Sequence, residues 1–122
     1  MDFDYNIPIY IQVSDDIKKK LVRGFLNPGD RLPSAADLSV EYHINPNTAQ
    51  RIFKNLEAEG IIFTRRGIGT FITEDAIKIE SLKKDIVDRL VGRFVSEMKE
   101  IGYSHQDIIE YIKKKGDFNG NA

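Results

Sequence analysis

The sequence has no cysteine and only two histidines among its 122 residues. Without cysteine, disulfide bonds, thiolate zinc sites and cysteine nucleophiles are excluded. No apolar run approaches the roughly 20 residues that span a bilayer, and the acidic start, MDFDYN, lacks the basic region of a signal peptide. We therefore expect no membrane span and a cytoplasmic location.

Catalytic groupings are scarce as well. His43 lies in a predicted turn and His105 opens the last predicted helix, and no second histidine or carboxylate stands at a ligand spacing from either. Isolated histidines of this kind are more often surface residues than ligands. Adjacent acids such as Asp15 and Asp16 point to different sides of a helix and cannot act as an acid–base pair on one bond. The sequence therefore predicts no enzyme, no cofactor and no metal site.

A strong charge of either sign is also missing. The formal net charge is −1, and residues 1–75 hold nine Lys or Arg against eleven Asp or Glu. A domain-wide basic signature for nucleic acid is thus absent. Between residues 43 and 73, however, four basic residues stand against two acidic ones. The positive charge is local, which predicts modest non-specific affinity for nucleic acid, with dimerisation making up the difference.

What is present is a pair of short helices joined by a tight turn. Ser34 can cap the first helix, with Asp37 three residues on, and Asn45 can cap the second, with Pro46 at its first position. Only residues 42–44 separate the two helices. So short a connection predicts a steep crossing, with the start of the second helix projecting outward.

The second helix has two different faces. Its apolar face follows helical spacing and comprises Ala49, Ile52, Phe53 and Leu56. Its polar face comprises Asn47, Thr48, Gln50, Arg51 and Lys54. Arginine can bind guanine bidentately, Asn or Gln can bind adenine, and Lys or Thr can hold phosphate. For a polar stripe taken alone, a solvated helix face is the simpler interpretation.

The next segment favours the nucleic-acid interpretation. Gly60 ends the helix, and the runs IIFTR and TFIT flank RGIG, a pattern typical of a hairpin with glycines at its tip. Such a hairpin is a wing, in which Arg65 and Arg66 can touch phosphate or enter a minor groove, while Gly67 and Gly69 allow close approach of the backbone. A nucleotide phosphate loop is excluded because no helix follows the glycines.

These motifs together resemble the GntR family of bacterial transcriptional regulators. The matching stretches are Pro8-Ile9-Tyr10-Ile11-Gln12, Pro28 to Ser34, Thr48 to Gly60 and Gly67-Ile68-Gly69-Thr70-Phe71. The resemblance covers about residues 7–73, and Asn45-Pro46-Asn47-Thr48 with a short tail resembles the YtrA-like subgroup. Many relatives have a DNA-contacting arginine two residues after the serine of L-P-S, where this chain has Ala36.

The resemblance and the motifs give a set of DNA-binding candidates. They are Ser34, Asn45, Asn47, Thr48, Gln50, Arg51, Lys54, Arg65, Arg66, Gly67, Gly69 and Thr70. Arg31 could face the DNA backbone or simply lie on the surface. The family further implies operator binding, most often repression, control of a transporter operon and the lack of a large effector domain; an effector of unknown identity stays open.

The remaining segments are predicted to be mostly helical. A first helix is expected from Pro8 to about Phe25, with Val13, Ile17 and Leu21 inward and the lysines 18–20 on a solvated surface. A long helix is expected from about residue 75 to Ile101, followed by a short one that Ser104 and Asp107 begin and that ends near Gly116. The last residues, 117–122, are expected to be disordered.

The two C-terminal helices have more apolar surface than they can bury against each other. A second copy is the expected partner, giving an isologous interface; packing onto the chain's own N-terminal domain is the alternative. The candidate interface residues are Leu82, Ile86, Leu90, Phe94, Met98, Ile101, Ile108 and Ile112. A dimer would present two recognition helices to a palindromic operator.

The sequence thus predicts a mainly α fold with a small β-hairpin. Residues 1–75 would form a winged helix-turn-helix DNA-binding domain and residues 76–116 a helical dimerisation segment. The predicted function is a homodimeric regulator of transcription that binds double-stranded operator DNA. The alternative is a winged-helix module that binds protein through the same polar face. An aminotransferase-like domain, as fused in some larger relatives, does not fit beyond the wing.

Overall fold

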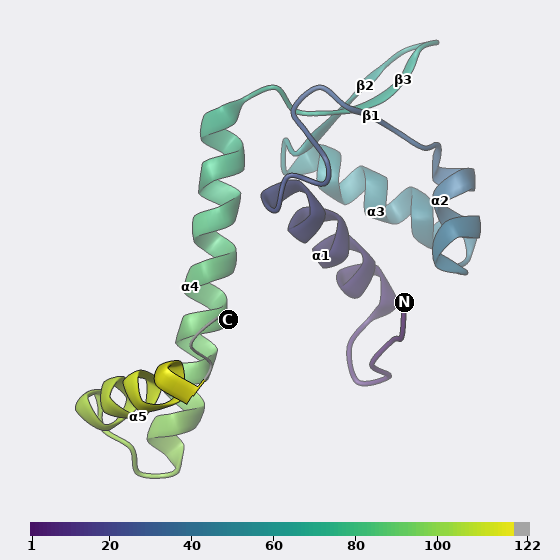
Figure 1. The fold of residues 1–122 in the computed structure, drawn as a ribbon. Helices are drawn as coiled ribbons and strands as arrows, with labels where there is room; N and C mark the ends of the chain where they lie inside the picture. Colours follow the sequence, from purple (N-terminus) through teal and green to yellow (C-terminus); the bar gives the residue numbers. More distant parts are fainter. Residues whose placement is uncertain (119–122) are drawn as a thin grey trace. The chain divides into compact units, whose positions relative to one another are not determined.

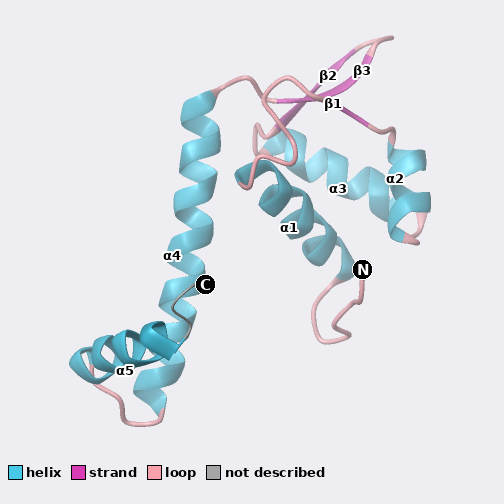
Figure 2. Cartoon of the chain, in the orientation of Figure 1, coloured by secondary structure: helices cyan, strands magenta, loops and turns pink. Residues whose placement is uncertain are grey.

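Five helices and one three-stranded antiparallel sheet make up the fold in the computed structural model, which describes residues 1–118 (Figures 1 and 2). The helices are α1 (Ile9–Val22), α2 (Ala35–Tyr42), α3 (Pro46–Ala58), α4 (Ala76–Glu100) and α5 (His105–Phe118). The strands are β1 (Arg31–Leu32), β2 (Ile62–Arg65) and β3 (Gly69–Ile72). The predicted fold class, a winged helix-turn-helix domain followed by two C-terminal helices, is confirmed.

The chain divides into two compact units, residues 1–83 and residues from 84 onward. The division falls inside α4, whereas the domain boundary expected from the sequence lies at residue 75, directly before that helix begins. Helix α5 continues to Phe118, two residues past the expected end at Gly116, and the rest of the expected tail, residues 119–122, lies outside the described residues. No helix of residues 1–118 is long and apolar enough to cross a membrane.

The helix ends follow from their capping residues. Ser34 Oγ accepts a hydrogen bond from the Asp37 N–H at 3.1 Å, and Asn45 Oδ1 accepts one from the Asn47 N–H at 2.7 Å. Both caps satisfy N–H groups that have no partner within the helix, as predicted. Ser104 and Asp107 form the reciprocal pair that begins α5. Helix α1 ends at Val22, earlier than expected, since Gly24 adopts a φ of 85° and turns the chain away.

The turn between α2 and α3 depends on one unusual residue. His43 adopts a left-handed conformation, with φ 56° and ψ 48°, the one positive φ outside glycine in the described chain. Its N–H donates to the Val40 carbonyl, and the Ile44 N–H donates to the Ser39 carbonyl. These bonds satisfy the last carbonyls of α2 and set the direction in which α3 starts.

The core of the first unit lies between the three helices and the sheet. Its fully buried members include Val13 of α1, Ile52 and Leu56 of α3, and Ile72 of β3. The predicted apolar face of α3 is confirmed for Ala49, Ile52 and Leu56, while Phe53 is only partly buried. Ile79 and Leu82, at the start of α4, pack against this same core.

The sheet has the order β1-β3-β2. β2 and β3 form the expected hairpin, with Phe63 opposite Phe71 and Arg65 opposite Gly69. β1 was not predicted, because two residues are too few to show an alternating pattern. Its pairing of Arg31 with Phe71 and Leu32 with Thr70 places the segment before α2 along the outer side of the wing.

The second unit comprises the rest of α4 and all of α5. Ile108 is buried within it, and the rings of Tyr103 and Tyr111 pack edge to face with centroids 6.4 Å apart. The apolar stripe of α4 stays open to solvent: Leu90, Val91 and Phe94 are 52%, 54% and 42% exposed. The described residues of α4 include no buried side chain.

Candidate nucleic-acid interface

A groove runs between the start of α2, the polar face of α3 and the wing. Six predicted DNA-binding residues line it: Ser34, Gln50, Arg51, Lys54, Gly69 and Thr70. Arg31, Phe53, Glu57 and Thr64 complete much of its surface. Three cationic side chains, from β1 and α3, therefore face one carboxylate in this groove, which gives it a positive local charge although the chain as a whole is slightly acidic.

The other predicted residues lie outside this groove. Asn45 and Asn47 are exposed at the start of α3, and Thr48 is partly buried. Arg65, Arg66 and Gly67 lie at the end of the hairpin and are all exposed. The structure thus brings half of the predicted set into one concave surface and leaves the rest at its two ends, the start of α3 and the wing tip.

Two of the predicted residues already have structural partners. The side-chain oxygens of Ser34 and Asn45 cap α2 and α3. A cap fixes the backbone N–H groups of the first helical turn, which can themselves face an anionic phosphate. The positions of Ser34 and Asn45 are therefore explained by folding alone, and a role in binding DNA would be additional.

Arg51 is held by an aromatic ring from another helix. Its guanidinium carbon lies 3.9 Å from the centroid of the Tyr10 ring of α1. This distance is well inside the range of a cation–π contact. Arg51 nevertheless stays exposed and lines the groove.

The wing is built around glycines and stacked rings. Gly67 has a φ of 76°, which suits glycine at the tip, where the Ile68 N–H donates to the Arg65 carbonyl. Phe63 and Phe71 stack with centroids 5.7 Å apart on the body of the hairpin, and the Arg65 guanidinium lies over the Phe63 ring at 5.5 Å. Arg66 is exposed at the turn, in the position expected for a phosphate contact.

For Arg31 the sequence left open a DNA-backbone contact or a simple surface position, and the structure places it in the groove. Its side chain lies across Gly69, where an added Cβ would come within 2.8 Å of the Arg31 Nε. Gly69 therefore leaves room for a cation from β1 on the wing. Only the pairing of β1 with β3 could have revealed this neighbour, and that pairing has no signal in the sequence. Ala36, where many relatives have arginine, is exposed and adds no charge.

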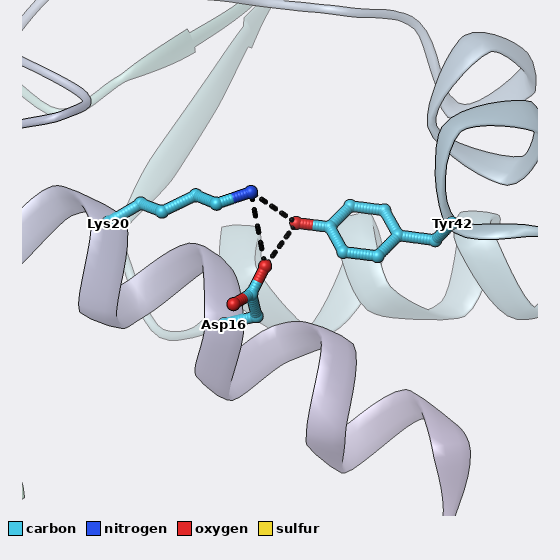
Figure 3. A network of polar contacts seen from close by, with 3 residues as sticks. All are labelled: Asp16, Lys20 and Tyr42. Carbon is cyan, nitrogen blue, oxygen red and sulfur yellow. Dashed lines mark hydrogen bonds and ion pairs between the residues drawn. The ribbon is translucent and has the colours of Figure 1, made fainter. Parts of the chain in front are cut away.

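A three-residue polar network holds the helix-turn-helix against α1 (Figure 3). The Tyr42 hydroxyl donates to Asp16 Oδ2 at 2.6 Å, and Lys20 Nζ donates to the Tyr42 oxygen at 3.1 Å and pairs with Asp16 at 3.1 Å. Tyr42 is the last residue of α2, so the network fixes the helix directly before the His43 turn.

Burial and the network together shift the pKa values of its three members. Burial, followed by the hydrogen bond to Asp16, raises the pKa of Tyr42 to about 12. Burial alone would raise the pKa of Asp16, but the hydrogen bonds from Tyr42 and Lys20 outweigh it and lower that pKa below its usual value. The hydrogen bond with Tyr42, supported by the Asp16 carboxylate, raises the pKa of Lys20. At neutral pH the network therefore consists of a carboxylate, a neutral phenol and an ammonium group.

A second ion pair joins α1 to the end of α3. Lys18 Nζ lies 3.0 Å from Glu59 Oε2, and the Lys18 side chain is only 17% exposed. The expectation that lysines 18–20 form a solvated surface is therefore wrong for Lys18. Lys20 keeps 39% of its side chain exposed, although it also bonds Tyr42, which is distant in the chain. The partners come from α2 and from the end of α3, which sequence spacing alone cannot place.

The predicted dimer residues fall into three groups. Leu90, Phe94, Ile101 and Ile112 are exposed, and Ile86 and Met98 are partly buried. Leu82 packs against the core of the first unit, and Ile108 is 4% exposed inside the second. Ile108 therefore offers little surface to a partner. No cluster of His, Cys, Asp and Glu in residues 1–118 is arranged to hold a metal ion.

Fold and groove together define a winged helix-turn-helix protein of the kind that binds DNA. The chain belongs to the gntR family of bacterial regulatory proteins, whose family model matches residues 9–72. The predicted family is thus confirmed, and with it the class of DNA-binding transcription regulators rather than enzymes.

Two relatives from Bacillus subtilis (strain 168) cover most of the chain. The uncharacterized HTH-type transcriptional regulator YhcF is 42% identical over 111 residues, which span 91% of this chain and 92% of YhcF. The HTH-type transcriptional repressor YtrA is 34% identical over 108 residues, which span 88% of this chain and 83% of YtrA. The similarity to YtrA supports the predicted YtrA-like subgroup.

A solved structure shows the same fold. A GntR family transcriptional regulator from Listeria monocytogenes superimposes with a TM-score of 0.87 at 40% sequence identity, and the match covers 92% of this chain and 98% of that one. The similarity therefore includes the C-terminal helices as well as the winged helix-turn-helix.

Proposed function

We propose that this protein is a cytoplasmic repressor of transcription that binds a palindromic operator as a homodimer. The proposal rests on one observation: Arg31, Arg51 and Lys54, from two elements, line a single groove between α3 and the wing of a GntR-family chain. A positively charged groove beside an exposed helix is the surface that duplex DNA requires. The name of the relative YtrA, a repressor, supports repression.

The residues take different roles in this proposal. Asn47, Gln50, Arg51 and Lys54 extend from α3 into the major groove, where amide, guanidinium and ammonium groups can bind base edges. Thr48 is partly buried at the rim and suits a phosphate contact. The wing residues Arg65, Arg66, Gly67, Gly69 and Thr70 would contact backbone or a minor groove, and Ser34 and Asn45 would present helix N-termini to phosphate.

The dimer is proposed from the exposed apolar side chains of the C-terminal helices. Leu90, Val91, Phe94 and Ile112 are each between 42% and 54% exposed. Exposed apolar surface of this kind on α4 and α5 is typical of an interface with another protein. A second copy would place two α3 helices about 34 Å apart, one turn of DNA, and thereby specify an inverted repeat.

Control of a transporter operon belongs to the same proposal. It rests on the resemblance to the YtrA-like subgroup rather than on any residue of the groove. Identification of the operator in a genome would name the regulated genes directly.

Selection of bound sequences from a random duplex pool tests the proposal. We expect enrichment of an inverted repeat, with an affinity that falls steeply as salt rises, since each neutralised phosphate steepens the logarithmic slope by about 0.9. A folded dimer that enriches no sequence would contradict operator binding. That outcome would favour the alternative, a module that binds protein through the polar face of α3.

A further inference from the structure

We propose that Tyr10 is a positioning residue for DNA recognition, because its ring supports the guanidinium of Arg51 at the edge of the groove. This inference rests on the proposed function and assigns a role to a residue outside α3 and the wing. It concerns base preference rather than the ability to bind DNA as such.

The contact joins a rigid platform to a flexible side chain. Tyr10 is partly buried and packs against the core of the first unit, whereas Arg51 is exposed. The guanidinium carbon lies 3.9 Å from the ring centroid. Among residues 1–118, the ring contact is the interaction that the structure gives for the charged end of Arg51, and no ion pair competes with it.

The platform itself is fixed in three ways. The Asp16–Lys20–Tyr42 network ties α1 to the end of α2, and the Lys18–Glu59 ion pair ties α1 to the end of α3. At the start of α1, Gln12 accepts a hydrogen bond from the Asp4 N–H and donates to the carbonyls of Asp4 and Ile7. These contacts tie the helix that carries Tyr10 to α2 and to the end of α3.

Stacking suits a guanidinium that must still form hydrogen bonds. An aromatic ring can take up the flat face of a guanidinium, whose N–H donors point outward in its plane. A stacked Arg51 thus keeps its donor pairs for a guanine edge, the base that arginine binds bidentately. A free arginine side chain loses rotamer entropy when DNA fixes it, and a ring that already holds the guanidinium reduces this loss on binding.

The opposite interpretation is that the ring withholds Arg51 from DNA. The position of Arg51 argues against it, because the residue lines the groove together with Lys54 and Arg31 while it is stacked. The two interpretations predict opposite effects of removing the ring: weaker operator binding if Tyr10 positions Arg51, and tighter binding if Tyr10 sequesters it.

A double-mutant cycle on the full chain tests the inference. The variants are Tyr10→Leu, which removes the ring but keeps apolar volume, Arg51→Ala and the combination of both. Affinity is measured against the selected operator and against operators changed at single base pairs. We expect Tyr10→Leu to weaken operator binding by roughly 2- to 30-fold, the range that cation–π energies correspond to. It should relax preference at the same base pair as Arg51→Ala, and cause no further loss when Arg51 is already absent.

Two controls separate positioning from folding. Tyr10→Phe keeps the aromatic face and should bind like the wild type. Combining Tyr10→Leu with Lys54→Ala should give additive losses, because among residues 1–118 the cation over the Tyr10 ring is Arg51 and not Lys54. Thermal unfolding of each variant shows whether the fold is retained.

Either of two results would overturn the inference. Equal losses from Tyr10→Leu with and without Arg51 would mean that Tyr10 acts through packing alone, and tighter binding by Tyr10→Leu would mean that the ring withholds Arg51. Both results require a wild type that binds its operator. A wild type that binds no duplex overturns the proposed function itself, and this inference with it.

Discussion

The hydroxyl of Tyr42 holds the last turn of α2 against α1. It is largely buried and lies between a carboxylate and an ammonium group, so its removal leaves Asp16 and Lys20 with one partner fewer. Hydrogen bonds to charged groups contribute about 1.5–3 kcal/mol each in folded proteins. Tyr42 therefore both stabilises the fold and positions the turn from which α3 starts.

We expect Tyr42→Phe to lower the free energy of unfolding by about 1–3 kcal/mol at neutral pH. The pKa of Tyr42 in the folded chain, about 12, lies above its ordinary value of 10.0. The folded chain favours the neutral phenol of Tyr42. Its contribution to stability is therefore complete below pH 10 and is lost as the pH rises toward 12. Urea unfolding of both proteins across this range should show the difference shrinking.

An absorbance titration provides an independent check of that shift. The spectrum of wild type minus Tyr42→Phe should report a single phenol with a pKa of about 12. Tyr5→Phe is the matched control, since Tyr5 is fully exposed, and it should leave the unfolding free energy unchanged. A difference titration centred near pH 10 would contradict the network as described.

Gly69 provides the second prediction at this scale. Gly69→Ala should lower the free energy of unfolding by about 1–3 kcal/mol, because alanine is strained at its backbone conformation, with φ 151°. It should also weaken DNA binding by displacing Arg31. In the Gly69→Ala/Arg31→Ala protein the clash disappears, so this variant should bind DNA no worse than Arg31→Ala alone. Fluorescence anisotropy with labelled operator measures the affinities.

Gly92→Ala serves as the control for Gly69→Ala and for the double variant Gly69→Ala/Arg31→Ala. Gly92 lies inside α4, and an added Cβ there meets no atom within 4 Å. The change should raise helix stability by about 1 kcal/mol, because alanine favours a helix over glycine. An unchanged affinity in Gly69→Ala would show that Arg31 contributes nothing to binding.

At the scale of elements, the proposed function gives α3 and the wing different roles in DNA binding. Helix α3 exposes amide and guanidinium groups along a straight, capped segment, which suits the reading of base edges. The wing exposes Arg65 and Arg66 at a two-stranded tip, which suits phosphate. The division makes the effects of substitutions in the two elements separable.

Gln50→Ala in α3 should relax preference at one operator position by about 1–3 kcal/mol, whereas Arg66→Ala in the wing should weaken binding to all sequences. Arg66→Ala should also reduce the salt slope by about 0.9, the value for one phosphate contact. Affinities for the operator and its single-base variants at two salt concentrations separate these effects. Lys99→Ala in α4 makes the same change of charge and is the control. A sequence-selective loss for Arg66→Ala would move that residue to base contacts.

The sequence predicted the elements whose pattern is local. The caps at Ser34 and Asn45, the apolar face of α3 and the hairpin all follow from residues within a few positions of each other. The features it missed depend on residues distant in the chain: the strand β1, the approach of Arg31 to Gly69, the stack of Tyr10 on Arg51, and the partners of Lys18 and Lys20. The sequence alone does not show which partner a polar side chain will have, because the fold decides which residues come near it.

At the scale of the whole molecule, the proposed dimer rests on the exposed apolar stripe of α4. Phe94→Glu should convert the proposed dimer to a monomer in sedimentation experiments, because a charge would be buried without a partner. Ser96→Glu adds the same charge two residues further on at an exposed position and should leave the dimer intact. A dimer that survives Phe94→Glu would place the interface elsewhere. Ile108 is a poorer test, because its burial within the second unit means that a charge there would unfold α5.

The placement of β1 also determines when the wing can be completed. β1 and β3 pair Arg31 with Phe71, about 40 residues apart in sequence, and closing so long a loop costs entropy that a local hairpin does not incur. During synthesis the β2–β3 hairpin emerges only after α1, α2 and α3, and residues 31–32 wait unpaired until then. We therefore expect β1 to pair late in folding, so that the groove shared by Arg31 and Gly69 forms after the β2–β3 hairpin.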